Sequence, residues 1–316
     1  MDVSIIIVNF NSANFLVDCL KSIKSQTSVP HEVIVVDNAS TDDSVDVIKR
    51  NCKGIMLIEN KKNSGFAKAN NQGFDNAQGR YLLMLNPDTI VLDKAIDKLV
   101  DYMDAHLDVG ICAPKNVDKN GKNQANCDYF PSIVNDVIEY LNLNRKFPDI
   151  ALLNRGRLLN WGYHEFREVD KVMGCSLIIR SELYKAVGGL DNRFFLYFEE
   201  TDLCYRVRKT NYKIMYHPLA SIIHFGGEST KTEKKKKLVV KMNMEYFFDS
   251  KFYFYKKNYG YGLAVLSRII DILYAYLVVI RNTFRKKGVQ KEQHLKKGKV
   301  YLSCLLPRKY NLPIAK

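Results

Sequence analysis

The sequence lacks the phosphate-binding motifs of the most common nucleotide-binding folds. No Gly-x-Gly-x-x-Gly follows the first apolar run, and no Gly-x-x-x-x-Gly-Lys-Ser/Thr occurs anywhere in the 316 residues. Those glycines and that lysine hold the phosphates in dinucleotide-binding and P-loop proteins. Their absence excludes dehydrogenases of the Rossmann type and P-loop NTPases, so carboxylate and amide groups would have to hold any nucleotide.

Cys-x-x-Cys pairs are absent too, and the first residues do not have the pattern expected of a secretory leader. The seven cysteines are odd in number and scattered, without a Cys-x-x-Cys pair, which favours free thiols in a reducing compartment. The chain opens with Met1-Asp2, and only the apolar run Ile5 to Val8 precedes Asn9. This run is too short for a signal peptide and predicts a buried strand, so we expect a cytoplasmic protein.

The net charge of +14 is distributed unevenly along the chain. Residues 1–230 carry 27 basic and 29 acidic side chains, whereas residues 231–316 carry 21 basic and 5 acidic ones. The near-neutral first part is not typical of a nucleic-acid-binding protein. The basic tail instead predicts contact with an anionic surface.

Apolar runs and helical patterns alternate through the first half of the chain. The runs predict buried parallel strands, and the intervening apolar residues recur at helical spacing. This alternation predicts an α/β fold with a doubly wound, mostly parallel sheet. The predicted strands are Val3–Phe10, Glu32–Asp37, Gly54–Asn60 and Tyr81–Asn86, and Ser12 is the expected cap of the first helix.

The second half is less regular. Residues 117–168 are rich in Asn, Lys, Asp and Tyr, which predicts a loop-rich insertion. A strand at 171–179 and a charged helix at 199–209 follow, so we expect a catalytic domain over 1–230 and a helical region over 231–316. Gly174, within the predicted strand, indicates either a close backbone approach to a substrate or a bulge.

The tail contains an apolar stretch of 18 residues, 263–280. This length is barely enough to span a bilayer. Arg268 and Asp271 interrupt the stretch, and each would cost about 2.5–3.5 kcal/mol at the bilayer centre. We therefore expect a helix that lies in the headgroup region of the cytoplasmic membrane face, with packing on the catalytic domain as the alternative.

Polar side chains follow each of the four predicted strands. Ligands of open α/β sheets bind at the carboxyl ends of the strands, so a turn former after one strand means little, whereas four in succession indicate a shared cleft. Asp37 is suited to accept a hydrogen bond from a pyrimidine imide or a ribose hydroxyl. The residues after the strands are Asn9, Asn11, Asp37, Asn38, Asn60, Asn63, Asn86 and Asp88.

Several segments resemble glycosyltransferase family 2, in the family's own order. Val3 to Asn11 and Val35 to Asp42 resemble its opening, and Asn63-Ser64-Gly65-Phe66-Ala67-Lys68-Ala69-Asn70-Asn71 resembles its rhamnosyltransferase-like subgroup. Leu85-Asn86-Pro87-Asp88-Thr89 and the stretch from Gly188-Gly189-Leu190-Asp191 to Arg206 complete the match. Over residues 3–230 the resemblance implies a GT-A type fold, an inverting reaction and a divalent metal. Asn9, Asn11, Asp37, Asn38, Asn63, Gly65, Phe66, Asn70 and Asn86 would bind the donor.

The resemblance also places a metal site. Asp88 stands at the family's acidic metal motif, whose first acid is here Asn86. A single carboxylate binds a hard cation weakly, so donor phosphates and a second protein ligand should complete the shell of Mg²⁺ or Mn²⁺. His224, in His224-Phe225-Gly226-Gly227-Glu228-Ser229, is the candidate, and an imidazole would shift the preference toward Mn²⁺. A structural role for this histidine is the alternative.

Three carboxylates gather at the start of the predicted charged helix, in Phe198-Glu199-Glu200-Thr201-Asp202. Aromatic residues precede them, which predicts partial burial and therefore greater basicity. A carboxylate of this kind can take the proton of an acceptor hydroxyl. By position Glu200 matches the family's base, with Glu199 and Asp202 as alternatives, and Asp191 would hold the acceptor.

The donor that the resemblance implies is deoxythymidine-diphosphate rhamnose, with a saccharide or a polyprenyl-linked saccharide as acceptor. A sugar-phosphate nucleotidylyltransferase is the competing enzyme class, but Asn9-Phe10-Asn11-Ser12 has neither the glycines nor the arginine that such a protein needs after its first strand. The basic tail alone would also fit a non-catalytic membrane-binding module.

Overall fold

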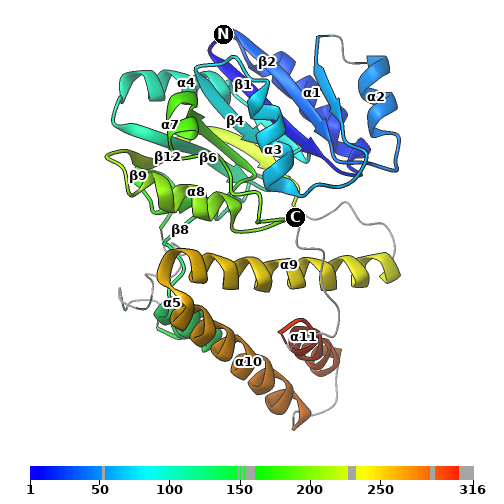
Figure 1. Cartoon of the computed structure of the whole chain (residues 1–316), viewed down its shortest axis with the longest axis vertical. Coiled ribbons are helices and arrows are strands. Elements are labelled where there is room, and N and C mark those ends of the chain that lie inside the picture. The colour runs from blue at the N-terminus through cyan, green and yellow to red at the C-terminus, as the bar shows by residue number, and fades with distance from the viewer. Residues whose placement is uncertain are drawn as a thin grey trace. The chain divides into compact units, whose positions relative to one another are not determined.

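The computed structural model describes residues 1–51, 54–147, 150, 153, 161–226, 233–284 and 289–305. The chain forms two compact units, which Figure 1 shows. The sheet unit comprises Met1–Phe130, Asn154–Phe195 and Glu199–Ser229, and the helical unit comprises Pro131–Leu153, Leu196–Phe198 and Thr230–Lys316. Unlike the division predicted at residue 230, this one assigns residues 131–153 and 196–198 to the C-terminal helices.

The sheet unit is built on one large mixed sheet. Strands β3, β2, β1 and β4 are parallel, as predicted. Strand β11 is antiparallel to both β4 and β6, and β12 is parallel to β6, so β6 and β12 run in the direction of β1. In sheet order the strands are β3 (Met56–Glu59), β2 (His31–Asp37), β1 (Val3–Asn9), β4 (Tyr81–Leu85), β11 (Ser176–Arg180), β6 (Val109–Val117), β12 (Lys213–His224) and β5 (Thr89–Leu92).

Helices cover both faces of this sheet. Because side chains alternate along a strand, Ile5 and Ile7 of β1 pack into one core and Ile6 packs into another. Helices α1 (Ala13–Gln26) and α4 (Ala95–Ala105) contribute to the first core, and α3 (Phe66–Asp75), α7 (Ser181–Ala186) and α8 (Glu199–Val207) contribute to the second. Helix α2 (Ser44–Asn51) packs on α1. The predicted doubly wound α/β architecture is confirmed.

The structure corrects three local predictions. The strand expected at 171–179 is interrupted at residues 173–175, so Lys171–Val172 (β10) pairs with Cys127–Asp128 (β8) in a separate sheet. The insertion at 117–168 has more structure than predicted, with α5 (Ile133–Tyr140), α6 (Leu143–Lys146) and the short strands β7 (Asn123–Gln124), β8 and β9 (Arg167–Glu168). The Ser12 hydroxyl donates to the carbonyl of Phe10 and accepts no capping hydrogen bond from the backbone of helix α1.

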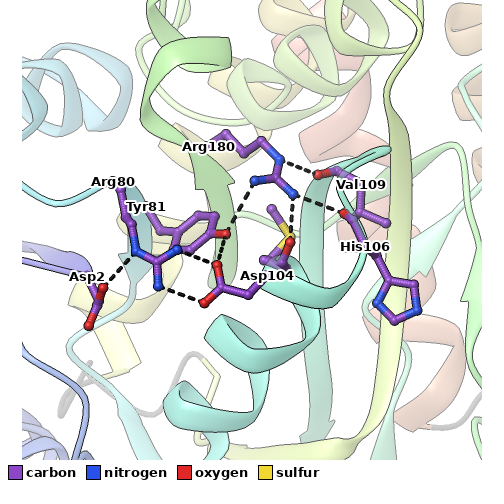
Figure 2. A network of polar contacts seen from close by, with 8 residues as sticks. Asp2, Arg80, Tyr81, Asp104, His106, Val109 and Arg180 are labelled. Carbon is purple, nitrogen blue, oxygen red and sulfur yellow. Dashed lines mark hydrogen bonds and ion pairs between the residues drawn. The ribbon is translucent and has the colours of Figure 1, made fainter.

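A polar network fastens the edge of the sheet at which the parallel strands begin (Figure 2). Arg80 pairs with Asp2 at 2.7 Å and with Asp104, which also accepts from the hydroxyl of Tyr81 at 2.6 Å. Arg180 donates to three carbonyls at and beyond the carboxyl end of α4, where helical carbonyls lack partners within the helix. Those carbonyls belong to Met103, His106 and Val109. These charges lie at the edge opposite the carboxyl ends of the parallel strands and have a structural role.

The helical unit consists mainly of long helices. Helix α10 packs against both α9 and α11, and α5 from the insertion packs on α10. The glycine of α11 at residue 298 allows close contact, because a Cβ there would lie 2.7 Å from Val279. The long helices are α9 (Glu233–Tyr259), α10 (Tyr261–Thr283) and α11 (Val289–Leu305).

A buried ionic cluster joins α5, α9 and α10 within the helical unit. The ammonium of Lys251 lies 2.7 Å from Asp271 and 2.9 Å from Asp136. Tyr140 donates to Asp271, and Tyr255 donates to Asp136. Burial raises the pKa of Asp136, while the charge of Lys251 opposes the rise. Buried charges persist only when they are paired and hydrogen-bonded, so this cluster fixes which faces of the three helices meet.

Candidate active site

The carboxyl ends of β1 and β2 are joined by hydrogen bonds between predicted site residues. The amide of Asn9 donates to Asp37 at 2.8 Å and to the hydroxyl of Ser40 at 3.0 Å. Both Asn9 and Asp37 are buried, and among the described residues the Asn9 side-chain carbonyl has no partner. Asn11 accepts from the backbone and the hydroxyl of Thr41. These hydrogen bonds form a preorganised polar cluster at the carboxyl ends of β1 and β2.

Asn38 organises the loop that leads into α3. Its amide donates to Asn63 at 2.9 Å and to the carbonyl of Gly65, and its own carbonyl accepts from the backbone of Ser64. Gly65 adopts a φ of 87°, and a Cβ there would lie 2.7 Å from the carbonyl of Phe195. Only glycine meets both conditions without strain. Asn38, Asn63 and Gly65 thus shape the loop rather than present free polar groups.

Two further predicted donor residues lie on α3. The backbone N–H of Phe66 donates to the carbonyl of Phe195 at 2.7 Å. The Asn70 amide donates to the carbonyl of Phe66 one turn earlier, and its side chain is buried. Its neighbour Asn71, which the sequence did not single out, bonds to the carbonyl of Leu190 and so holds the loop containing Asp191. The Asn70 side chain serves the helix itself.

A turn at residues 173–175, in which Cys175 is buried, links the metal motif with the carboxylates of α8. The backbone N–H of Asn86 donates to the carbonyl of Cys175 at 2.9 Å. Burial raises the pKa of the Cys175 thiol to about 12, and the charges of Asp88 and Glu200 both contribute in the same direction. A Cβ on Gly174 would lie 3.4 Å from the Cβ of Glu200. Asp88 and Glu200, separated by 112 positions in the chain, therefore border the same turn.

Asp88 and His224 face one another. Strand β12 ends at His224, which pairs with Thr89 at the start of β5, and the N–H of Phe225 donates to the carbonyl of Asp88. The Nε2 atom of His224 lies 3.6 Å from the Oδ1 atom of Asp88, and both side chains are 19% exposed. The sequence paired these residues only by family resemblance, and the structure brings them together. Gly227 to Ser229 of the same motif lie outside the described residues.

Gln124 on β7 orients the imidazole and was missed by the sequence reasoning. Its amide nitrogen donates to the backbone carbonyl of His224 at 2.9 Å, and its oxygen lies 3.2 Å from Nδ1 of His224. Because that oxygen can only accept, Nδ1 carries the proton and Nε2 keeps its lone pair toward Asp88. Gln124 lies in the insertion, 100 positions from His224 in the chain. No motif around Gln124 identifies it as a site residue.

This pair fits a divalent cation that has donor phosphates as further ligands. Two ligand atoms 3.6 Å apart can share one ion, since each bonds to it at about 2.1 Å. Across the described residues, no group of three or more His, Cys, Asp or Glu side chains could hold a metal by itself. A metal at this place would have Asp88 and His224 as its protein ligands, and Gln124 would supply the contact that commonly fixes the tautomer of a metal-binding histidine.

Replacing Gln124 with leucine is expected to lower the affinity for Mn²⁺ about 10–100-fold, the usual cost of losing such a supporting contact. Titration calorimetry with Mn²⁺ in the presence of a nucleoside diphosphate measures this affinity. Asn123→Leu, at the exposed neighbouring position of β7, is the control. Equal affinities in the two variants would show that Gln124 does not orient a metal ligand.

The two glutamates at the start of α8 have different surroundings. Glu199 is buried, and its Oε2 has no partner in the part of the chain that the structure describes. Burial, with the charge of Glu200 in second place, raises the pKa of Glu199 well above its usual value. Glu200 is partly exposed, and the hydroxyl of Thr201 donates to it at 3.3 Å. Burial therefore favours the protonated form of Glu199, and Glu200 is the more accessible carboxylate.

Asp202 and Asp191 are engaged in ion pairs. Asp202 is fully buried and lies 2.9 Å from Nε of Arg206, whose guanidinium also donates to the carbonyl of Val187. Asp191 lies 2.9 Å from Arg193. The Asp202 contacts anchor α8, so the geometry favours Glu200 over Asp202 as a base. A role for Asp191 toward the acceptor would require the carboxylate to share its contact with Arg193.

The sequence of this chain is similar to those of known glycosyltransferases. Residues 4–158 match the family model "Glycosyl transferase family 2". A low-salt glycan biosynthesis hexosyltransferase, Agl10 of Haloferax volcanii, is 28% identical over 229 residues, which is 71% of this chain and 67% of the relative. An N-acetylglucosaminyl-diphospho-decaprenol L-rhamnosyltransferase of Mycobacterium tuberculosis is 24% identical over 255 residues, covering 77% and 82% of the two chains.

A solved structure has a similar fold. The mannosyltransferase PcManGT from Pyrobaculum calidifontis, in complex with GDP-Man and Mn²⁺, superposes with a TM-score of 0.53 over 96% of this chain and 85% of its own, at 14% identity. The fold is consistent with the GT-A type. The family match covers residues 4–158, just under half of the 316, so the chain resembles glycosyltransferase family 2 over its first half.

Proposed function

We propose that this protein is an inverting, metal-dependent glycosyltransferase that moves one sugar from a nucleoside-diphosphate donor to a hydroxyl of a saccharide acceptor. The carrying observation is the approach of Asp88 and His224 to 3.6 Å at the same turn that Glu200 borders. A divalent ion bound there would neutralise charge that develops on the departing diphosphate.

The role proposed for Glu200 follows from the accessibility of its carboxylate. Glu200 takes the proton of the acceptor hydroxyl, whose oxygen forms a bond to the anomeric carbon while the bond to the diphosphate oxygen breaks. The polar cluster that contains Asn9 and Asp37 binds the nucleoside part of the donor. Direct displacement inverts the anomeric centre and needs no covalent intermediate with the protein. Asp88 and His224 would hold the ion, and Mn²⁺ suits this carboxylate and imidazole pair better than Mg²⁺.

For the finer specificity we propose deoxythymidine-diphosphate rhamnose as donor and a polyprenyl-linked saccharide as acceptor, in the synthesis of a cell-surface polysaccharide. Support comes from the resemblance of Asn86-Pro87-Asp88 and of the stretch from Gly188 to Arg206 to the rhamnosyltransferase-like subgroup. The name of the mycobacterial relative, which combines rhamnose with a decaprenol-linked acceptor, points the same way.

Slow hydrolysis of a panel of nucleotide sugars tests this function. With Mn²⁺ the protein is expected to cleave one donor in preference to the others, and cleavage should stop when the metal is chelated. Cleavage of the rhamnose donor would support the finer assignment, whereas preference for a uridine-diphosphate hexose would replace it. No cleavage, together with no metal-dependent nucleotide binding by calorimetry, would overturn the transferase and favour a binding module.

A further inference from the structure

Helix α10 has the reverse of the usual amphipathic arrangement of a helix in a water-soluble protein. Its buried positions include polar or small residues, whereas every exposed residue between 263 and 280 is apolar. The helices of soluble proteins normally bury their apolar stripe. The buried residues of α10 are Ala264, Ser267, Asp271, Ala275 and Asn282, and the exposed ones are Leu263, Leu266, Ile269, Leu273, Tyr276, Leu277 and Ile280.

The polar groups of α10 find their partners inside the helical unit. Asp271 is 3% exposed and pairs with Lys251 of α9. Arg268 pairs with Asp249 of α9 at 3.0 Å. The two charges that argued in the sequence against a membrane-crossing helix are therefore paired with α9 and do not point outward from the apolar face.

The exposed residues form one continuous stripe. They recur at spacings of three and four residues, which places them on one side of a helix. The individual exposed fractions range from 42% at Leu263 and Leu266 to 56% at Leu273 and Leu277. A contiguous apolar surface of this kind usually marks a binding surface for a protein or a membrane. Phe284, 86% exposed, extends the stripe at its carboxyl end.

Both ends of the stripe carry positive charge and aromatic rings. Lys256 and Lys257 precede α10 and are exposed, and Tyr261 is 64% exposed at its start. Arg281 is exposed at the other end, where the sequence continues into Arg285-Lys286-Lys287, outside the described residues. Aromatic rings and cations are the residues that favour the headgroup level of a membrane.

We infer that the outer face of α10 lies in the plane of an anionic membrane surface, with its apolar stripe in the boundary between headgroups and acyl chains and the flanking cations against lipid phosphates. Basic side chains near such a surface each contribute about 1 kcal/mol of attraction. This binding surface does not depend on the proposed transferase function, although it would suit a lipid-linked acceptor.

A second copy of the chain fits this face less well than lipid does. Any pairing of two α10 stripes, parallel or antiparallel, would bring cationic ends next to cationic ends, because both ends of the stripe are basic. Like charges in contact oppose such a pairing. Anionic lipid would attract the same cations instead of repelling them. An anionic membrane is therefore the better partner for the exposed face of α10.

An in-plane position fits better than a transmembrane one. Among the residues that the structure describes, α10 is the one helix long and apolar enough to cross a membrane. However, α9 and α11 pack along its other side, and α9 carries Lys251 and Asp249 there. A crossing would draw those charges into the hydrocarbon, whereas an in-plane helix buries only its outer face.

Flotation of the full-length protein with vesicles tests the inference. Vesicles of phosphatidylcholine with phosphatidylglycerol should bind the protein at low salt, and pure phosphatidylcholine should bind it much less. The variant Leu266→Glu with Leu273→Glu should weaken binding at least about tenfold, since two apolar contacts are lost and two anions are added. Leu107→Glu with Leu219→Glu, at exposed apolar positions of the sheet unit, is the matched control and should bind as the unaltered protein does.

The outcomes separate the occupants of the face. Equal vesicle binding by both double variants, or no binding by the unaltered protein, would overturn the inference. A dimer in sedimentation equilibrium that the α10 variant abolishes, without vesicle binding, would assign the face to a second copy. Tryptophans placed at Leu263 and Leu273 should be quenched equally by brominated lipid, whereas deeper quenching at Leu273 would indicate a crossing helix. Circular dichroism confirms that each variant is folded.

Discussion

Replacing Asp88 with asparagine is expected to lower the affinity for Mn²⁺ by more than about 100-fold and kcat for sugar transfer by about 10²–10³-fold. The substitution keeps the size of the side chain and removes its charge. His224 alone then faces the ion, and a single neutral imidazole holds a hard cation weakly. Titration calorimetry and electron paramagnetic resonance of Mn²⁺ measure the binding separately from turnover.

The matched control is Asp93→Asn. Asp93 pairs with Lys98 at the surface and has a φ of 47°, which asparagine tolerates. This variant should bind Mn²⁺ and turn over as the unaltered protein does. Normal metal affinity in Asp88→Asn would remove Asp88 from the site. If Asp88→Asn lost sugar transfer but kept its affinity for Mn²⁺, Asp88 would have a role other than binding the ion.

Replacing Glu200 with glutamine is expected to lower kcat by about 10²–10⁴-fold, the usual contribution of a general base. The amide keeps the shape of the side chain but cannot accept the proton of the acceptor hydroxyl. Donor and metal binding should change little, because Asn9, Asp37, Asp88 and His224 are untouched. Transfer kinetics with the preferred donor, together with donor binding by calorimetry, measure the two quantities.

The comparison with Glu199→Gln decides which glutamate is the base. Burial raises the pKa of Glu199 well above its usual value and so favours the neutral carboxyl, whose charge an amide matches. Glu199→Gln should therefore lower kcat much less than Glu200→Gln does. The opposite ranking would make Glu199 the base, and a small loss in both variants would exclude the start of α8 from the chemistry.

Much of the candidate site could be predicted because it lies in short segments with local signals. The apolar runs predicted strands whose ends differ from the observed ones by one or two residues, as for Gly54–Asn60 and Met56–Glu59. Parallel strands in one sheet present their carboxyl ends at one edge, so Asn9, Asp37 and Asn86 had to meet there. The insertion was harder, since helix α5 is short and its apolar residues do not set it apart from a loop.

The sequence by itself determined the α/β class, the order of the strands along the chain and the residues of the strand-end site. Hydrophobic periodicity and turn chemistry are local properties, so they can be read without a structure. Only the tertiary structure decided that Gln124 orients His224, that Glu199 is buried while Glu200 is accessible, and that α10 turns its apolar face outward. Each of these depends on a partner distant in the chain. A helix with charged and apolar faces can bury either one, and the contact between Lys251 and Asp271 decided which face is buried.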